Sequence, residues 1–123
     1  MWPFSSSTEP KDKKVNFKNL DKDYAVSGQI LPAQIPAIAA AGFKSIVCAR
    51  PDNEDHGQPS FDEVAREAEK AGLQIVHVPV SGMVGQGAFM KFEQAMEQMP
   101  KPVLAYCRSG GRAASLYTML KRA

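Results

Sequence analysis

A cysteine followed by a glycine-rich turn and an arginine is the stretch of this 123-residue chain with the clearest chemistry. Residues 103–112 read VLAYCRSGGR, so a short apolar run ends at Cys107 and a small loop leads to Arg112. This order predicts a strand, a tight loop and the first turn of a helix. The loop N–H groups and the positive end of the helix dipole would then stabilise the Cys107 thiolate over the thiol. The sequence therefore predicts Cys107 as a nucleophile.

Arg112 completes this pattern, because a planar guanidinium can hold two oxygens of one anion. We predict Cys107 and Arg112 as the catalytic pair. The residues expected to bind the anion or substrate are Arg108, Ser109, Gly110, Gly111 and Arg50. In the alternative interpretation, Cys107 is a small buried side chain at the end of a strand and the glycines form an ordinary turn. The joint placement of glycines, arginine and helix start favours chemistry.

Composition indicates one globular domain, since 44% of the residues are hydrophobic and 23% are charged. Residues 1–17 lack periodicity and are expected to form a flexible leader, with a single domain over residues 18–123. The net charge is only +2, and many of the lysines lie near the two ends, so no nucleic-acid partner is expected. No apolar run is long enough to span a membrane, and no secretory signal is visible. Two distant cysteines favour a reducing, cytoplasmic location.

Strand and helix patterns alternate along the chain. Strands are expected at residues 24–27, 43–48, 73–80 and 103–106, and helices at 31–41, 61–71, 89–99 and 113–120. This alternation predicts an α/β domain with a central, mostly parallel sheet of about four or five strands and helices on both faces. Ligands bind such sheets beyond the carboxyl ends of the strands. There the sequence places Cys48 to Arg50, the loop of residues 81–87 and the cysteine loop.

Arg50 and its neighbours have two interpretations each. Arg50 is either a second clamp on the anion or a surface arginine that fixes its own acidic loop. That loop holds Asp52, Glu54, Asp55 and His56, one of which either supplies a general acid or belongs to an ordinary solvated charged loop. Cys48 is either a resolving thiol for Cys107 or a buried structural thiol. No metal and no other cofactor are predicted, because no cluster has metal-ligand spacing.

Four segments resemble the bacterial beta-lactamase hydrolase-like, phosphatase-like domain family. They are Gly28-Gln29, residues 41–44 (AGFK), residues 50–52 (RPD) and the cysteine loop, and the resemblance extends over about residues 17–123. It implies a dual-specificity-phosphatase-like fold and a thiolate enzyme. Members are described as phosphatase-like. Some, fused to or encoded near persulfide dioxygenases, are described as rhodanese-type sulfurtransferases.

Departures from the phosphatase pattern guide the functional prediction. The spacing is Cys-x4-Arg rather than Cys-x5-Arg, residues 81–87 contain no carboxylate, Ala113 replaces a hydroxyl residue and Tyr106 replaces a histidine. Without a general acid, loss of an alkoxide slows by about 10²–10⁴-fold. Sulfur transfer needs no such proton, since sulfite or a thiolate leaves.

These departures favour a sulfurtransferase that passes a sulfane sulfur through a Cys107 persulfide to a thiol or cyanide. Its expected partners are a small-molecule anion or persulfide donor, a thiol acceptor and, by the resemblance, a persulfide dioxygenase. Two alternatives stay open. One is a phosphatase that hydrolyses phosphate monoesters through a phosphocysteine, and the other is a non-catalytic anion-binding or partner module.

Overall fold

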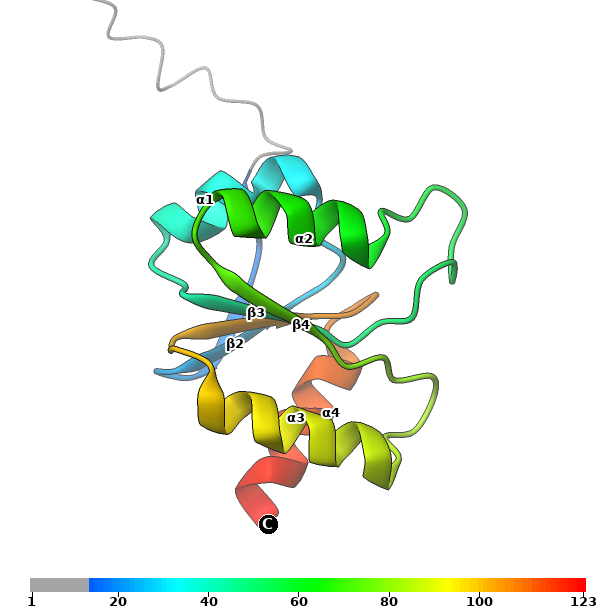
Figure 1. Cartoon of the computed structure of the whole chain (residues 1–123). Helices are drawn as coiled ribbons and strands as arrows, with labels where there is room; N and C mark the ends of the chain where they lie inside the picture. The colour runs from blue at the N-terminus through cyan, green and yellow to red at the C-terminus, as the bar shows by residue number, and fades with distance from the viewer. Residues whose placement is uncertain (1–13) are drawn as a thin grey trace, which may run out of the picture.

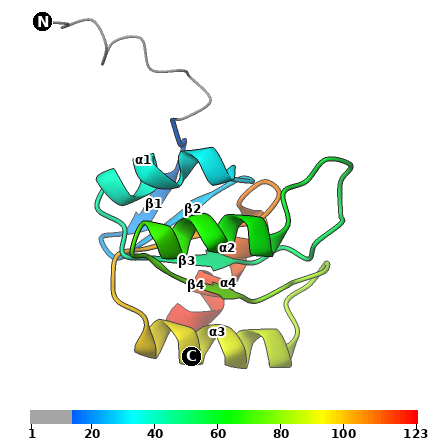
Figure 2. The same ribbon diagram turned by 45° about the horizontal axis from the view of Figure 1, so that its top comes forward.

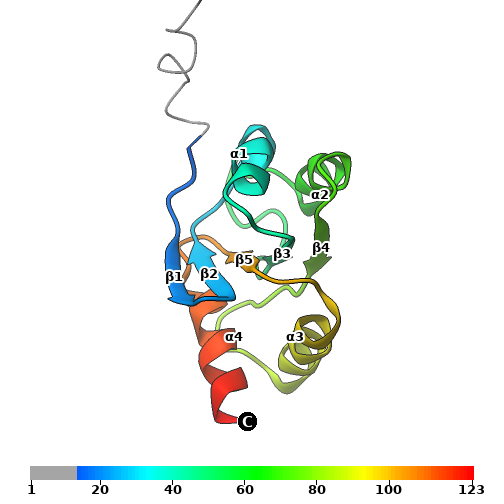
Figure 3. The same cartoon turned by 90° about the vertical axis from the view of Figure 1, so that its left-hand side faces the viewer.

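A five-stranded sheet forms the centre of the protein in the computed structural model, which describes residues 14–123. The strands are β1 (Lys18–Asp21), β2 (Tyr24–Ser27), β3 (Ser45–Cys48), β4 (Gln74–His77) and β5 (Val103–Tyr106). They lie in the order β1-β2-β5-β3-β4, and only β1 runs antiparallel to its neighbour (Figure 3). The predicted α/β class with a mostly parallel sheet is therefore confirmed.

Helices cover both faces of this sheet. They are the 3-10 helix η3 (Pro32–Gln34), α1 (Ile35–Ala40), α2 (Phe61–Lys70), α3 (Gln86–Gln98) and α4 (Gly111–Arg122). Helices α1 and α2 lie on one face, and α3 and α4 lie on the other (Figure 1). The single helix expected at residues 31–41 is divided into η3 and α1, because each begins with a proline in its first turn.

The edge strand β1 was not predicted from the sequence. Its four residues, KNLD, are mostly exposed and show no apolar alternation, so it has no strand signal of its own. It forms because its backbone pairs with β2, with Lys18 opposite Val26. Most of the expected leader, residues 1–13, lies outside the described residues. Within the described part, Val15 packs against the core.

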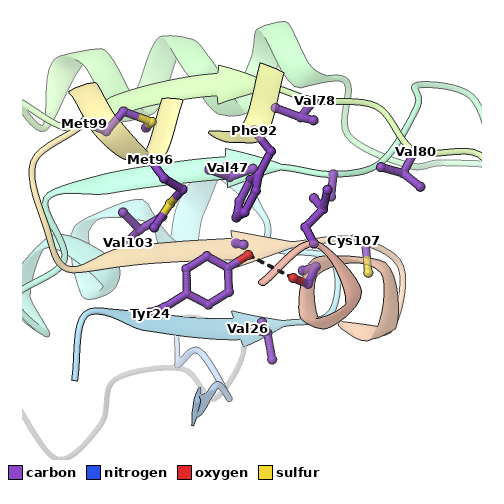
Figure 4. Close-up of a cluster of buried hydrophobic side chains, with 14 residues drawn as sticks. Tyr24, Val26, Val47, Val78, Val80, Phe92, Met96, Met99, Val103 and Cys107 are labelled. Atoms are coloured by element: carbon purple, nitrogen blue, oxygen red, sulfur yellow. Dashed lines mark hydrogen bonds between the residues drawn. The ribbon is translucent and has the colours of Figure 1, made fainter. Parts of the chain in front are cut away.

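Side chains along the central strand β5 alternate between the two faces of the sheet, and this alternation sets the direction in which Cys107 points. Val103 and Ala105 pack into the cluster on the α3–α4 face, and Cys107, just beyond the strand, continues their side (Figure 4). Leu104 and Tyr106 pack into the cluster on the α1–α2 face. Since successive side chains of a strand point to opposite faces, Cys107 projects toward the start of α4.

Candidate active site

The cysteine loop connects the end of β5 to the first turn of α4. Cys107 is 1% exposed, and its Sγ accepts a hydrogen bond of 3.0 Å from the backbone N–H of Gly110. Gly110 has a φ of +94°, a left-handed conformation that favours glycine, and it directly precedes α4. This geometry gives the sulfur a backbone donor and the positive end of a helix dipole, as predicted from the sequence.

The end of β2 supports the loop from its other side. The N–H of Cys107 donates to the carbonyl oxygen of Ser27, and the N–H of Gln29 donates to that of Arg108. A Cβ at Gly28 would lie 3.0 Å from the same Arg108 carbonyl oxygen. A side chain there would require this carbonyl to move by a few tenths of an ångström, which gives a physical reason for the glycine.

Arg112 is held by hydrogen bonds from part of its guanidinium to Val80 and Glu54. Its Nη1 donates to the carbonyl oxygen of Val80 at 2.6 Å and to Glu54 Oε2 at 2.7 Å, and its Nη2 donates to Glu54 Oε1 at 2.9 Å. A guanidinium has five N–H donors. The remaining two, Nε–H and one Nη2–H, lie side by side, which leaves a forked donor pair for an anion.

Glu54 holds Arg112 in this orientation. Hydrogen bonds from Arg112, together with a hydrogen bond from Arg50, lower the pKa of Glu54 from 4.5 to about 2, although burial acts in the opposite direction. The carboxylate is therefore ionised at neutral pH and has no proton to give. Of the two interpretations of this residue, general acid or solvated carboxylate, the geometry matches neither. Glu54 instead positions an arginine.

Arg50 is a second arginine that binds Glu54. It is 2% exposed, and its three nitrogens donate to Glu54 at 2.8 Å, to Gln29 Oε1 at 2.7 Å and to Asp55 Oδ2 at 2.5 Å. Asp55 also pairs with the exposed Arg108 at 3.1 Å. The geometry thus matches the interpretation in which Arg50 fixes its own acidic loop. The second-clamp role would require these bonds to be exchanged.

The structure does not bring Cys48 and Cys107 together. Cys48 lies opposite Tyr106 in the pairing of β3 with β5, in the cluster on the α1–α2 face. Its thiol donates to the carbonyl oxygen of Arg50 at 3.4 Å, and burial raises its pKa. Because Cys107 belongs to the opposite cluster, the sheet separates the two thiols. This placement matches a structural thiol rather than a resolving one.

The loop between β4 and α3 lies beside Arg112. Figures 1 and 2 show this loop, the acidic loop after β3 and the cysteine loop at one end of the molecule. The three segments that the topology was expected to bring to one edge of the sheet therefore lie together. A cavity of about 460 Å³ is lined by Gly82, Met83, Val84, Arg112, Ser115 and Met119. None of these lining residues is a carboxylate, in agreement with the gap noted in the sequence.

Among residues 14–123, no group of three or more His, Cys, Asp and Glu side chains is arranged to hold a metal ion. No helix in this part of the chain is both long enough and apolar enough to cross a membrane.

Sequence comparisons identify the same family that the four segments of the sequence resemble. The model of the family described as "Beta-lactamase hydrolase-like protein, phosphatase-like domain" matches residues 16–123. A beta-lactamase hydrolase-like protein of Agrobacterium fabrum is 37% identical over 101 residues, which are 81% of this chain and 23% of that protein. One from Xylella fastidiosa is 33% identical over 102 residues, 82% of this chain and 24% of that protein. The chain spans about a quarter of the length of these curated relatives.

Solved structures share the fold. A candidate phosphatase from Neisseria meningitidis superposes with a TM-score of 0.77 at 35% identity, over 85% of this chain and 75% of that chain. The core catalytic domain of a PP-IP phosphatase from S. cerevisiae, in complex with citrate, has a TM-score of 0.65 at 17% identity, over 89% and 66% of the two chains. At 17% identity the second likeness shows the fold alone. The predicted phosphatase-like architecture is confirmed.

Proposed function

Since the chain belongs to the family of the beta-lactamase hydrolase-like protein, phosphatase-like domain, we propose that it is a cysteine-dependent phosphatase acting on phosphate monoesters. The observation that carries this proposal is the pair of free donors on Arg112 beside a thiol that already accepts a backbone N–H. Of our two catalytic hypotheses from the sequence, the phosphatase alternative fits the comparisons better than sulfur transfer. The matching family model and the structure from Neisseria meningitidis are both described as phosphatase-like, and neither supports a sulfurtransferase.

The chemistry follows from the site geometry. The Cys107 thiolate attacks phosphorus, a P–S bond forms, the ester P–O bond breaks, and its electron pair leaves with the alcohol oxygen. The Nε–H and Nη2–H of Arg112 hold two non-bridging oxygens and balance their charge. Water then attacks the phosphocysteine, and inorganic phosphate leaves as the thiolate is restored. Glu54 stays ionised in both steps and keeps Arg112 aligned.

One specific observation still favours sulfur transfer, namely the short cysteine loop. Six residues, from Cys107 to Arg112, close the ring, and Ala113 offers no hydroxyl to assist hydrolysis of a phosphocysteine. The same thiolate would attack a sulfane sulfur, displace the donor's sulfite or thiolate, and hold the sulfur as a persulfide until a thiol attacks it and restores the Cys107 thiolate. This second candidate predicts a mass increase of about 32 Da on Cys107 after incubation with a persulfide donor, the increment for one sulfur atom.

Phosphate release from an aryl phosphate tests the proposal directly. The wild type is compared with Cys107→Ser and with Cys48→Ser, a matched control because Cys48 lies on the other face of the sheet. We expect release that requires Cys107 and survives loss of Cys48, with a phosphorylated Cys107 peptide after rapid acid quench. Absence of Cys107-dependent release at every pH from about 5 to 8 would refute the proposal. A persulfide in place of the phosphocysteine would favour the second candidate.

A further inference from the structure

Arg108 directly follows Cys107, and its side chain does not lie with that of Arg112. Its Nε is 3.1 Å from Asp55 Oδ2, in the acidic loop after β3, and 67% of the side chain is exposed. Its two Nη groups carry four N–H donors, and within residues 14–123 these donors have no hydrogen-bond acceptor. Arg108 therefore presents a positively charged group with free donors beside the cysteine loop.

The three arginines around the site differ in the donors that they have left. Arg50 is buried, and all three of its nitrogens already donate hydrogen bonds. Arg112 keeps two adjacent donors, which the proposed mechanism assigns to the phosphoryl group. Arg108 is exposed and keeps both of its Nη groups free, so it is the arginine that is available to a further ligand group.

Arg108 and Arg112 bind neighbouring residues of the acidic loop. Arg112 donates to Glu54, whereas Arg108 pairs with the next residue, Asp55. Arg50 joins these two carboxylates, so both outer guanidiniums belong to one network, yet each has a carboxylate of its own. A phosphoryl group held by Arg112 therefore leaves Arg108 for a different group of the same molecule.

The contact between Arg108 and Asp55 can be exchanged for a ligand at little cost. An exposed ion pair is weak, because water screens the two charges. Asp55 keeps its hydrogen bond of 2.5 Å from Arg50 when Arg108 turns away, so no carboxylate loses its last partner. The network of three arginines and two carboxylates also has one positive charge in excess, which favours an anionic group at this point.

Building on the proposed phosphatase function, we infer that the substrates are phosphate monoesters that carry a second anionic group, and that Arg108 binds this group. A phosphate and a carboxylate both suit it, because a guanidinium binds either of them through two parallel N–H donors. Arg108 is then a specificity-determining residue, whereas Arg112 binds the phosphoryl group that is transferred to Cys107.

Non-hydrolysable phosphonates test this role without relying on turnover. The wild type is titrated with methylene, trimethylene and hexamethylene diphosphonates, each beside the methyl-, propyl- or hexylphosphonate of the same chain length. Binding is followed by the NMR shifts of the cysteine-loop amides, and the three lengths sample the separation of the two guanidiniums. We expect at least one diphosphonate to bind about fivefold to tenfold tighter than its monophosphonate, of which about twofold comes from its two equivalent ends. In Arg108→Gln only that twofold remains.

Arg122→Gln is the matched control, because Arg122 is an exposed arginine at the other end of α4 and its replacement removes the same charge. This variant should keep the full gain. A gain that is absent at all three lengths, or that survives in Arg108→Gln, overturns this inference, and Cys107-dependent phosphate release then still supports the phosphatase function. Lack of Cys107-dependent phosphate release with the gain intact overturns the proposed function instead and leaves Arg108 as an anion-binding residue.

Discussion

Replacing Glu54 by glutamine changes one atom and removes the contact that orients Arg112. The carboxylate accepts three hydrogen bonds, two from Arg112 at 2.7 and 2.9 Å and one from Arg50 at 2.8 Å. In Glu54→Gln, the amide NH2 group has no lone pair for a guanidinium N–H. At least one of these bonds is lost, and the two arginines lose the negative charge between them.

The size of the effect follows from exposure and geometry. A hydrogen bond to a charged group contributes about 1.5–3 kcal/mol when it is buried. The Glu54 side chain is 25% exposed, so we discount this range and expect a loss of about 1–2 kcal/mol in the free energy of unfolding. Activity falls further, because an Arg112 held by the Val80 carbonyl and by at most one side-chain oxygen at position 54 can rotate its free donors away from Cys107. A misplacement of about 1 Å costs up to about 100-fold, so we expect kcat/KM to fall about 10- to 100-fold.

Steady-state kinetics on an aryl phosphate and urea unfolding measure the two effects separately. Glu69→Gln is the matched control, since Glu69 is an exposed carboxylate of α2, away from the cysteine loop. Glu54→Asp, which keeps the charge, should recover part of the lost kcat. Two results would refute the reasoning. If Glu54→Gln loses stability but keeps its kcat/KM within about twofold, Glu54 is purely structural. If kcat/KM rises, Glu54 competes with substrate for Arg112.

Acid sensitivity, a close approach at Gly28 and the separation of the two thiols give three further predictions. Because the pKa of Glu54 is lowered from 4.5 to about 2, its stabilisation is fully present above pH 4.5 and is lost as the pH falls toward 2, so urea unfolding of wild type and Glu54→Gln should converge across that range. Gly28→Ala places a Cβ 3.0 Å from a carbonyl oxygen of the cysteine loop and should cost about 1–2 kcal/mol and lower kcat, whereas Gly85→Ala, with nothing within 4 Å, should do neither. Mild peroxide should produce no disulfide between Cys48 and Cys107, and a cross-linked peptide pair in non-reducing mass spectrometry would contradict their placement on opposite faces.

The parts of the fold that the sequence predicted are those whose signal is local. The capping box of Ser60 and Glu63 marks the start of α2, and the structure contains both of its hydrogen bonds. The strands β2, β3 and β5 are buried along their whole length, so their mostly apolar sequences predict buried strands. Strand β1 was missed for the opposite reason. It is polar and exposed, and only its pairing with β2 makes it a strand.

The cysteine loop was predictable, and the residue that orients its arginine was not. Cys107, Gly110 and Arg112 lie within six residues, so one stretch of sequence shows the thiol, the turn and the cation together. Glu54 lies 58 residues before Arg112, and their pairing depends on β3 lying next to β5. The acidic loop did stand out in the sequence. Which of its carboxylates meets which arginine is a property of the folded edge of the sheet.

The short loop and the missing acid have a different meaning once the donors of Arg112 are counted. From the sequence they indicated sulfur transfer, because a smaller ring suits a single sulfur atom. In the structure, Glu54 and Val80 occupy three of the five donors and leave a fork that fits two oxygens of one anion. A fork of this kind matches the phosphoryl group of a phosphocysteine better than the outer sulfur atom of a Cys107 persulfide, which has no pair of oxygens to bind. The missing acid then limits which esters are cleaved, and it does so by the basicity of the group that must leave.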